Sequence, residues 1–232
     1  MAIYAISDLH LSKAIDKPMD VFGGWENYME KIEENWSNTV SREDWVLIPG
    51  DISWATYLEE SLMDFRFIDG LPGRKIIIKG NHDYWWTTLS KLNGFLESRG
   101  IKNIHFLNNN SYICEGTAVC GTRGWICPGS PEFTEHDAKI HNRELNRLEL
   151  SIRSLRGKEY NDILVMLHYP PFYSNGVDSE FLELMKSYGV KKCIYGHLHG
   201  PALKDAAEGV IGGIQFLLTS CDHIGFSPLR LY

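Results

Sequence analysis

The stretch RKIIIKGNHDYWW, residues 74–86, joins a short apolar run to the polar tetrapeptide Gly80-Asn81-His82-Asp83. The β-branched run at 74–79 is bounded by glycines and predicts a buried strand. Apolar residues at spacings of four, three and four then predict a helix over residues 84–99, which Gly100 ends. Open α/β sheets bind their ligands at the carboxyl ends of the strands. The tetrapeptide alone fits such a site and a plain polar loop equally well.

Polar residues follow other predicted strands in the same way. Strands are predicted at residues 2–7, 45–48, 162–167 and 192–195, and the continuous apolar run at 162–167 is typical of a strand covered on both faces. The polar residues that follow the predicted strands are Asp8, His10, Asp51, Asn81, His82, Asp83, His168, His197 and His199. A single histidine in such a place is more often structural than a ligand. The recurrence at one sheet edge favours a shared metal cluster, because buried polar groups need partners.

The donor types narrow the metal that such a cluster would hold. Imidazole, carboxylate and one amide oxygen suit borderline or hard divalent ions such as Mn, Fe or Zn, and do not suit a structural zinc bound by thiolates. The five cysteines form no CxxC pair and their number is odd. A disulfide framework is therefore not expected, and a reducing compartment is.

The remaining segments complete an alternation of strands and helices. The sequence predicts helices over residues 25–40, 55–68, 137–156 and 179–188, further strands over 104–107, 111–122, 210–219 and 229–232, hairpin turns at 115–116 and 212–213, and a long surface loop over 123–135. No repeat, low-complexity tract or linker-like stretch interrupts this pattern. We therefore expect an α/β protein with a single domain over residues 1–232.

Charge and the N-terminal sequence limit the possible partners. The net charge of −7 provides no general attraction to long nucleic acids or to anionic membranes. The N-terminal sequence MAIYAISDLH has no basic region, and its apolar run stops at Asp8, so it predicts neither a signal peptide nor a membrane span. We expect a cytoplasmic protein that contacts no membrane, and the sequence leaves its oligomeric state open.

Five blocks in this order resemble the calcineurin-like metallophosphoesterase superfamily. They are Asp-x-His at 8–10, Gly-Asp at 50–51, Gly-Asn-His-Asp at 80–83, an apolar strand that ends in His168, and Gly-His-x-His at 196–199. Each block is weak alone, whereas the ordered set is highly specific. The resemblance implies a four-layer α/β/β/α sandwich, in which two mixed β-sheets are flanked by helices, and two divalent metal ions bridged by one carboxylate.

The resemblance also implies a role for each matching residue. Asp8, His10 and His199 would hold the first ion, Asn81, His168 and His197 the second, and Asp51 would bridge the two. A hydroxide shared by ions about 3.5–4 Å apart would attack phosphorus in line. His82 would act as the general acid that protonates the leaving oxygen, with Asp83 orienting its ring. The implied activity is hydrolysis of a phosphomonoester or phosphodiester.

Departures from the family pattern point to one branch. The Ser/Thr protein phosphatases that this superfamily includes usually carry Asp-Arg-Gly after the bridging aspartate, and Gly-Asn-His-Glu. This sequence has Asp51-Ile52-Ser53-Trp54 and ends the second motif in Asp83. The pattern is therefore closer to the bacterial-type phosphohydrolases.

Two residues outside the five blocks are candidate substrate contacts. Arg123 could donate two hydrogen bonds to a substrate phosphate, although a solvated loop arginine is the commoner case. Trp86 could stack on a ring, whereas Trp85 is expected in the core. Lys139, Arg143 and Arg147 recur every four residues and predict an exposed basic strip.

Three functions remain open at this stage. The first is hydrolysis of a small or medium phosphoester. The second is a catalytically inactive binding or scaffold module with the same fold, and the third is a nucleotide hydrolase or nuclease of that fold. The acidic balance makes long nucleic acid an improbable substrate without opposing nucleotides.

Overall fold

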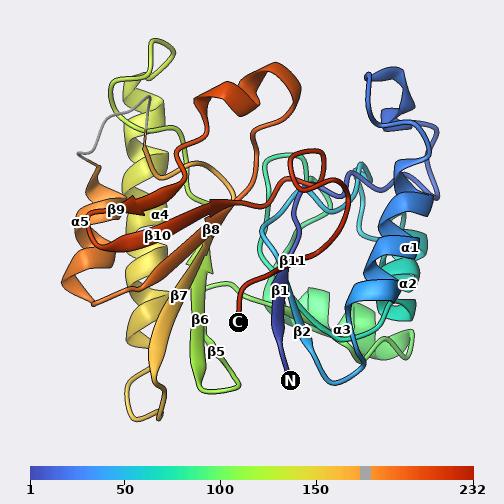
Figure 1. The fold of residues 1–232 in the computed structure, drawn as a ribbon, viewed down its shortest axis with the longest axis horizontal. Helices are drawn as coiled ribbons and strands as arrows, with labels where there is room; N and C mark the ends of the chain where they lie inside the picture. Colours follow the sequence, from blue (N-terminus) through green and yellow to red (C-terminus); the bar gives the residue numbers. More distant parts are fainter. Residues whose placement is uncertain (173–178) are drawn as a thin grey trace.

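The computed structural model describes residues 1–172 and 179–232, which form two β-sheets lying face to face (Figure 1). The first sheet has the strand order β11-β1-β2-β3-β4. Its strands are β1 (Ile3–Ala5), β2 (Trp45–Ile48), β3 (Arg74–Ile77), β4 (Ile104–Phe106) and β11 (Leu229–Arg230). The second sheet has the order β5-β6-β7-β8-β10-β9. Its strands are β5 (Tyr112–Cys114), β6 (Thr117–Thr122), β7 (Asp162–Leu167), β8 (Lys192–Tyr195), β9 (Gly209–Ile211) and β10 (Ile214–Leu218).

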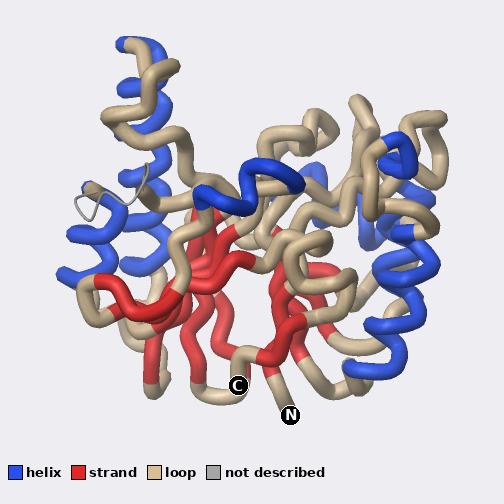
Figure 2. The backbone as a smooth tube through the Cα atoms, turned by 45° about the horizontal axis from the view of Figure 1, so that its top comes forward, coloured by secondary structure: helices blue, strands red, loops and turns tan. Residues whose placement is uncertain are grey.

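Both sheets are parallel at the centre, and the first has one antiparallel edge strand whereas the second has two. Strands β1 to β4 pair in parallel and β11 runs antiparallel to β1. In the second sheet β6, β7, β8 and β10 are parallel, whereas β5 and β9 are antiparallel edge strands. Parallel strands present their carboxyl ends at one edge, so the loops that follow them gather there, as Figure 2 shows.

Helices cover the outer face of each sheet (Figure 1). The first sheet is covered by α1 (Tyr28–Thr39), α2 (Leu62–Gly70) and α3 (Leu89–Ser98), and the second by α4 (Glu135–Arg153) and α5 (Glu180–Ser187). Two short 3₁₀ helices, η1 (Met19–Val21) and η2 (Gly200–Asp205), lie in loops. The predicted four-layer α/β/β/α sandwich is therefore confirmed.

The hydrophobic core has three layers, and the central one joins the two sheets. Ile3, Leu47 and Ile76 of the first sheet pack with Leu164 and Ile194 of the second, all almost fully buried. Burial of apolar area at about 25 cal/mol per Å² makes this contact a main source of stability. The sheets are thereby fixed against each other, and so are the loops at their common edge.

Three predicted helices begin later in the structure than the apolar spacing indicates. Helix α3 begins at Leu89, not at residue 84, and the Thr88 side chain accepts the N–H of Lys91 as its N-cap. Trp85 instead turns inward and donates its indole N–H to Asp83 Oδ1 at 3.1 Å. This side-chain bond holds residues 84–88 in a non-helical turn that apolar spacing alone does not reveal.

The late start of α2 has the same kind of cause, and that of α1 leaves Trp25 outside the helix. Helix α2 begins at Leu62 instead of residue 55, because the Glu60 carboxylate accepts the N–H groups of Thr56 and Tyr57 and closes a turn there. Helix α1 begins at Tyr28, so Trp25 is buried in the loop before it. The strand and hairpin predictions agree with the structure to within a few residues at each end.

Candidate metal centre

The carboxyl ends of the central strands bring all seven predicted metal ligands to one place. Asp8 and His10 follow β1, Asp51 follows β2, and Asn81 follows β3. His168 follows β7, and His197 and His199 follow β8. Several of these residues have left-handed backbone conformations, with φ of 60° at Asp8, 44° at His10, 53° at Asp51 and 74° at His197. Such conformations are costly for non-glycine residues and cluster at functional sites.

A glycine lets two of these loops touch. A Cβ atom at Gly80 would overlap the backbone nitrogen and the carboxylate of Asp51. The backbone N–H of His82 donates to Asp51 Oδ1 at 2.8 Å. Glycine is therefore required between the β2 and β3 loops, which explains its place directly before Asn81.

Asp8, His10 and His199 form the first group of donor atoms. The Nε2 atom of His199 lies 3.3 Å from Asp8 Oδ1 and 3.3 Å from His10 Nε2. Their donor atoms lie within 4.8 Å of one another, as a shared cation would need. Asp8 and His10 are buried, whereas the side chain of His199 is 25% exposed, so the group opens to solvent on the side of His199.

A second group lies beside the first and shares carboxylates with it. His168 Nε2 lies 3.4 Å from Asp51 Oδ2. The donor atoms of Asp8, Asp51 and His168 also lie within 4.8 Å of one another. Asn81 Oδ1 lies 2.6 Å from His168 Nε2 and 2.9 Å from His197 Nδ1. Asp51 Oδ2 is also 3.8 Å from His10 Nε2, so this carboxylate faces both groups.

The hydrogen bonding of His168 fits a bound cation. Its Nδ1 lies 2.9 Å from the carbonyl oxygen of Pro49, which can only accept, so Nδ1 carries the proton. Burial lowers the pKa of His168 to about 3, so the ring is neutral near pH 7. Its Nε2 therefore points a lone pair at Asn81 Oδ1, another acceptor. Two lone pairs that face each other repel, and a metal ion between them would be coordinated by both atoms.

The two central carboxylates have pKa values shifted in opposite directions. Burial would raise the pKa of Asp8, but the His199, His168 and His10 imidazoles hold it well below its usual range. The pKa of Asp51 is raised by burial and by the Asp83 and Asp8 carboxylates. The cluster thus has more carboxylate than its own side chains can neutralise, and divalent cations would supply the missing charge.

Asp222 is a member of the site that sequence reasoning missed. Its Oδ1 lies 3.3 Å from His199 Nδ1, and its Oδ2 accepts the N–H of Gly200 at 2.9 Å. Burial would lower the pKa of His199, but the Asp8 and Asp222 carboxylates together raise it to about 10. The available signal was that Asp222 follows β10, a parallel strand, as the other site residues follow theirs.

Asp83 has a different position from the predicted one. Its carboxylate accepts the backbone N–H groups of Gly80, Asp51 and Ile52 at 2.7, 3.0 and 2.9 Å, as well as the Trp85 indole N–H. Within residues 1–172 and 179–232 it makes no hydrogen bond to the His82 ring. The expectation that Asp83 orients this ring is therefore wrong. Asp83 instead ties the β2 loop to the β3 loop, and burial raises its pKa to about 6 although these N–H donors oppose the shift.

His82 lies at the mouth of the cluster. Its ring centroid is 4.5 Å from the ring of Trp54 and 5.6 Å from that of His10. Burial and the neighbouring Lys17 ammonium lower its pKa below the ordinary value. Trp54 also stacks on His10 at 4.6 Å, so one aromatic side chain contacts both His10 and His82.

The two predicted substrate contacts do not join the donor cluster. Arg123 and Trp86 both line a separate cavity of about 360 Å³, together with Lys79 and Arg147. In the predicted exposed strip on α4, Lys139 and Arg143 are exposed, and the Arg147 side chain is 39% exposed while its Nη1 lies 3.1 Å from the buried Glu144.

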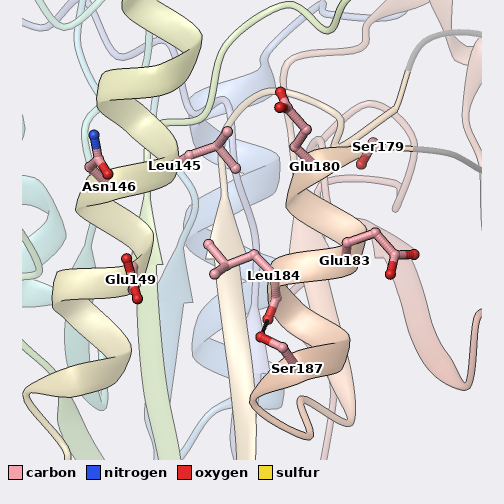
Figure 3. Close-up of a pocket in the computed structure, with 8 residues that line it drawn as sticks. All are labelled: Leu145, Asn146, Glu149, Ser179, Glu180, Glu183, Leu184 and Ser187. Carbon is pink, nitrogen blue, oxygen red and sulfur yellow. Dashed lines mark hydrogen bonds between the residues drawn. The ribbon is translucent and has the colours of Figure 1, made fainter.

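A larger groove lies elsewhere on the molecule, between α4 and α5 (Figure 3). It has a volume of about 580 Å³, and its lining includes the carboxylates of Glu149, Glu180 and Glu183. These would repel a phosphate, and none of the predicted ligands lines the groove. We therefore assign the candidate site to the strand ends.

Comparisons with known proteins agree with this fold. A protein of unknown function from Aquifex aeolicus has 17% identity and a TM-score of 0.51, with 99% of this chain and 95% of that chain covered. A protein of Thermus thermophilus has 14% identity and a TM-score of 0.57, with coverage of 99% and 97%. Purple acid phosphatase from yellow lupin (Lupinus luteus) seeds has 16% identity and a TM-score of 0.51, with coverage of 100% and 45%. The comparison with curated proteins found no similar sequence.

Two further observations concern the whole chain. No helix among residues 1–172 and 179–232 has the length and apolar character needed to span a membrane. The family model for calcineurin-like phosphoesterases matches residues 1–201, a stretch that contains every predicted metal ligand. The chain therefore belongs to the calcineurin-like phosphoesterase family, whose members bind a dinuclear metal centre.

Proposed function

We propose that this protein is a metal-dependent phosphoesterase that hydrolyses a small or medium phosphomonoester or phosphodiester. The observation that carries the proposal is the convergence of two buried carboxylates, an amide oxygen and neutral imidazoles at one edge of both sheets. These donors suit two divalent ions, of which Mn, Fe and Zn fit the mixture of oxygen and nitrogen best.

The ligand roles in this proposal follow the two groups of donor atoms. Asp8, His10 and His199 would hold one ion, and Asn81, His168 and His197 the other. Asp51 would contact both, because its carboxylate faces both groups. When bound, such ions lower the pKa of water toward neutrality and neutralise charge on the phosphoryl oxygens.

The remaining residues act on the substrate and on the ligands. His82, at the mouth of the cluster, would donate a proton to the leaving oxygen, which is worth roughly 10²–10⁴-fold for a poor leaving group. Asp222 would hold the His199 ring in the orientation that presents Nε2 to the ion. Asp83 would keep Asp51 and Asn81 in register through its backbone hydrogen bonds.

The location of the protein is part of the same proposal. All five cysteines are free and buried. Burial raises the pKa values of Cys114, Cys120 and Cys127 to about 12, so these thiols stay protonated and unreactive. A reducing compartment, and thus the cytoplasm, is the setting that we propose.

The direct test is turnover by the purified full chain with Mn²⁺. The proposal predicts hydrolysis of p-nitrophenyl phosphate or of bis-p-nitrophenyl phosphate that a chelator abolishes and added metal restores. Asp51→Asn should lose this activity, whereas Glu159→Gln, an exposed carboxylate before the start of β7, should retain it. Absence of metal-dependent turnover of both esters would contradict the proposed function.

A further inference from the structure

A basic cavity of about 360 Å³ is lined by residues that adjoin the loops of the candidate metal centre. Its walls come from the ends of three strands, with Lys79 after β3, Asn108 after β4 and Arg123 after β6. Helix α4 contributes Arg147, and Trp86 forms an apolar wall. Three cationic side chains from separate elements thus line one cavity.

The cavity lies next to the ligand loops through the backbone. Lys79 directly precedes Gly80 and Asn81. The carbonyl oxygen of Arg123 accepts the N–H groups of His168 and Tyr169, both at 2.9 Å. The same short segments therefore carry the metal donors and the walls of the basic cavity.

The positive charge in this cavity exceeds the negative charge that faces it. Glu144 is fully buried, and its carboxylate lies 3.1 Å from Arg147 Nη1 and 3.8 Å from Arg123 Nη2. The same carboxylate accepts the hydroxyl of Thr122 at 2.5 Å. It can neutralise one of the two arginines, and Lys79 has no ion pair or side-chain hydrogen bond within the described part of the chain. The excess of cations over carboxylates attracts an anion.

Arg123 is held in place with donor capacity to spare. Its side chain is only 15% exposed, and its guanidinium lies 4.3 Å from the centre of the Trp125 ring. Its Nε atom is buried and has no hydrogen-bond partner among the described residues. A buried donor without a partner costs free energy unless a ligand or a water satisfies it. A preorganised guanidinium is well suited to a phosphate or carboxylate group.

We propose that this cavity binds a second anionic group of the substrate, a phosphate or a carboxylate, at a distance from the phosphoester that is cleaved. The proposal rests on the proposed function, since it assigns the substrate class of that same site. Lys79, Arg123 and Arg147 contact the second anion, and Trp86 packs against the chain that connects the two anionic groups. A structural role, in which the arginines only balance Glu144, is the alternative that the test separates.

The kinetic test compares esters that differ only in a second anion. Alkyl monophosphates, α,ω-alkanediol bisphosphates and ω-carboxyalkyl phosphates of matched chain length are assayed with the manganese-loaded full chain. We expect the KM of the best ester with two anionic groups to be about tenfold lower than that of the matched alkyl monophosphate, as one charge-assisted contact allows. The carboxylate and phosphate arms show which anion the cavity prefers. Equal KM values at every chain length would overturn the proposal.

A matched pair of arginines separates binding from structure. Arg147 and Arg143 lie one turn apart on α4 and both approach Glu144, but only Arg147 lines the cavity. Arg147→Gln should reduce the preference for the ester with two anionic groups to less than about twofold, while Arg143→Gln retains it. An equal loss in both variants would mean that the arginines only neutralise Glu144, which would overturn the proposal.

A binding measurement keeps the cavity testable apart from turnover. Inorganic phosphate is titrated into the chelator-treated full chain, and tryptophan fluorescence reports occupancy through Trp86. We expect Arg147→Gln and Lys79→Gln to weaken phosphate binding by about tenfold relative to wild type and Arg143→Gln. Binding of this kind without esterase activity would refute the proposed function and support the cavity. Esterase activity without this binding, and without any preference for esters with two anionic groups, would refute only the proposal that the cavity binds an anion.

Discussion

The two sheets contribute different chemistry to the candidate metal centre. The first sheet supplies every oxygen donor, through Asp8, Asp51 and Asn81, and one imidazole, that of His10. The second sheet supplies only imidazoles, those of His168, His197 and His199. The negative charge that would attract cations is therefore concentrated on one side of the sheet interface. The other side supplies imidazoles whose position depends on how the two sheets pack.

The loops of the two sheets are also held differently. On the first sheet, the Asp83 carboxylate joins two loops through backbone N–H groups of Gly80, Asp51 and Ile52. On the second sheet, the Nδ1 atom of the His168 ring contacts the Pro49 carbonyl, and the Nδ1 atom of the His199 ring contacts Asp222. This difference suggests that first-sheet substitutions should act on the whole site, and second-sheet substitutions on one ligand at a time.

The largest expected effect is that of Asp51→Asn. The substitution removes the one carboxylate that faces both groups of donor atoms, so tight binding of both ions should be lost. We expect metal affinity to fall by more than about 100-fold, because the loss of a residue that only supports a metal ligand already costs up to about 100-fold. Elemental analysis of the purified variant measures it. Two retained ions per chain would show that the first sheet does not dominate.

Asp83→Asn should destabilise the first-sheet side of the site. The amide group of Asn cannot accept all the backbone N–H groups that the carboxylate accepts, so some buried donors lose their partner. We expect the free energy of unfolding to fall by about 3 kcal/mol. Chemical denaturation with chelator present measures this without metal effects. A change below about 0.5 kcal/mol, the usual range for a surface substitution, would contradict the role of Asp83 in joining the β2 and β3 loops.

Asp222→Asn should affect only one ligand of the second sheet. It weakens the contact that orients His199 and leaves the loops of the first sheet intact. We expect metal affinity to fall by about 10-fold, with little change in the unfolding free energy of the chelated protein. Isothermal titration with Mn²⁺ and a denaturation curve measure the two effects. Equal losses of affinity for Asp222→Asn and Asp51→Asn would remove the distinction between the sheets.

The smallest expected effect concerns the pH dependence of His82. Burial and the Lys17 ammonium both lower its pKa, and a general acid must be protonated to act. The rate on alkyl esters should therefore decline as pH rises through a pKa below 6.5. Lys17→Met should raise this pKa and move the decline to higher pH, by less than about one unit because exposed charges are screened.

A pH–rate profile of the variant tests this sign directly. Lys13→Met is the matched control, since the Lys13 ammonium lies over the Phe67 ring and is not among the groups that shift His82. An unchanged profile for Lys17→Met, or a shift of the decline to lower pH, would argue against His82 as the acid.

The sequence predicts the metal ligands well because each of them follows a strand that a local apolar run predicts. An apolar run such as 162–167 predicts β7 locally, and its parallel neighbour β8 must then present His197 at the same edge as His168. Contacts between loops have no such local signal. Asp83 and Trp85 are two residues apart in the chain, yet their bond delays α3 and gives Asp83 its role.

The features that sequence reasoning missed are contacts between distant segments. Asp222 reaches His199 only after β10 has paired with β8. Arg147 also reaches the buried Glu144 one turn before it, and Arg123 approaches the same carboxylate from the end of β6. Side-chain partners of this kind depend on the packing of sheets and helices, which periodicity does not encode.

Diffraction from crystals grown with manganese, recorded at a wavelength where its anomalous signal is strong, tests the central claim most directly. The account predicts two anomalous peaks at the carboxyl ends of the central strands. One should be contacted by Asp8, His10 and His199, the other by Asn81, His168 and His197, and the Asp51 carboxylate should reach both. A single peak, or no peak among these side chains, would contradict it.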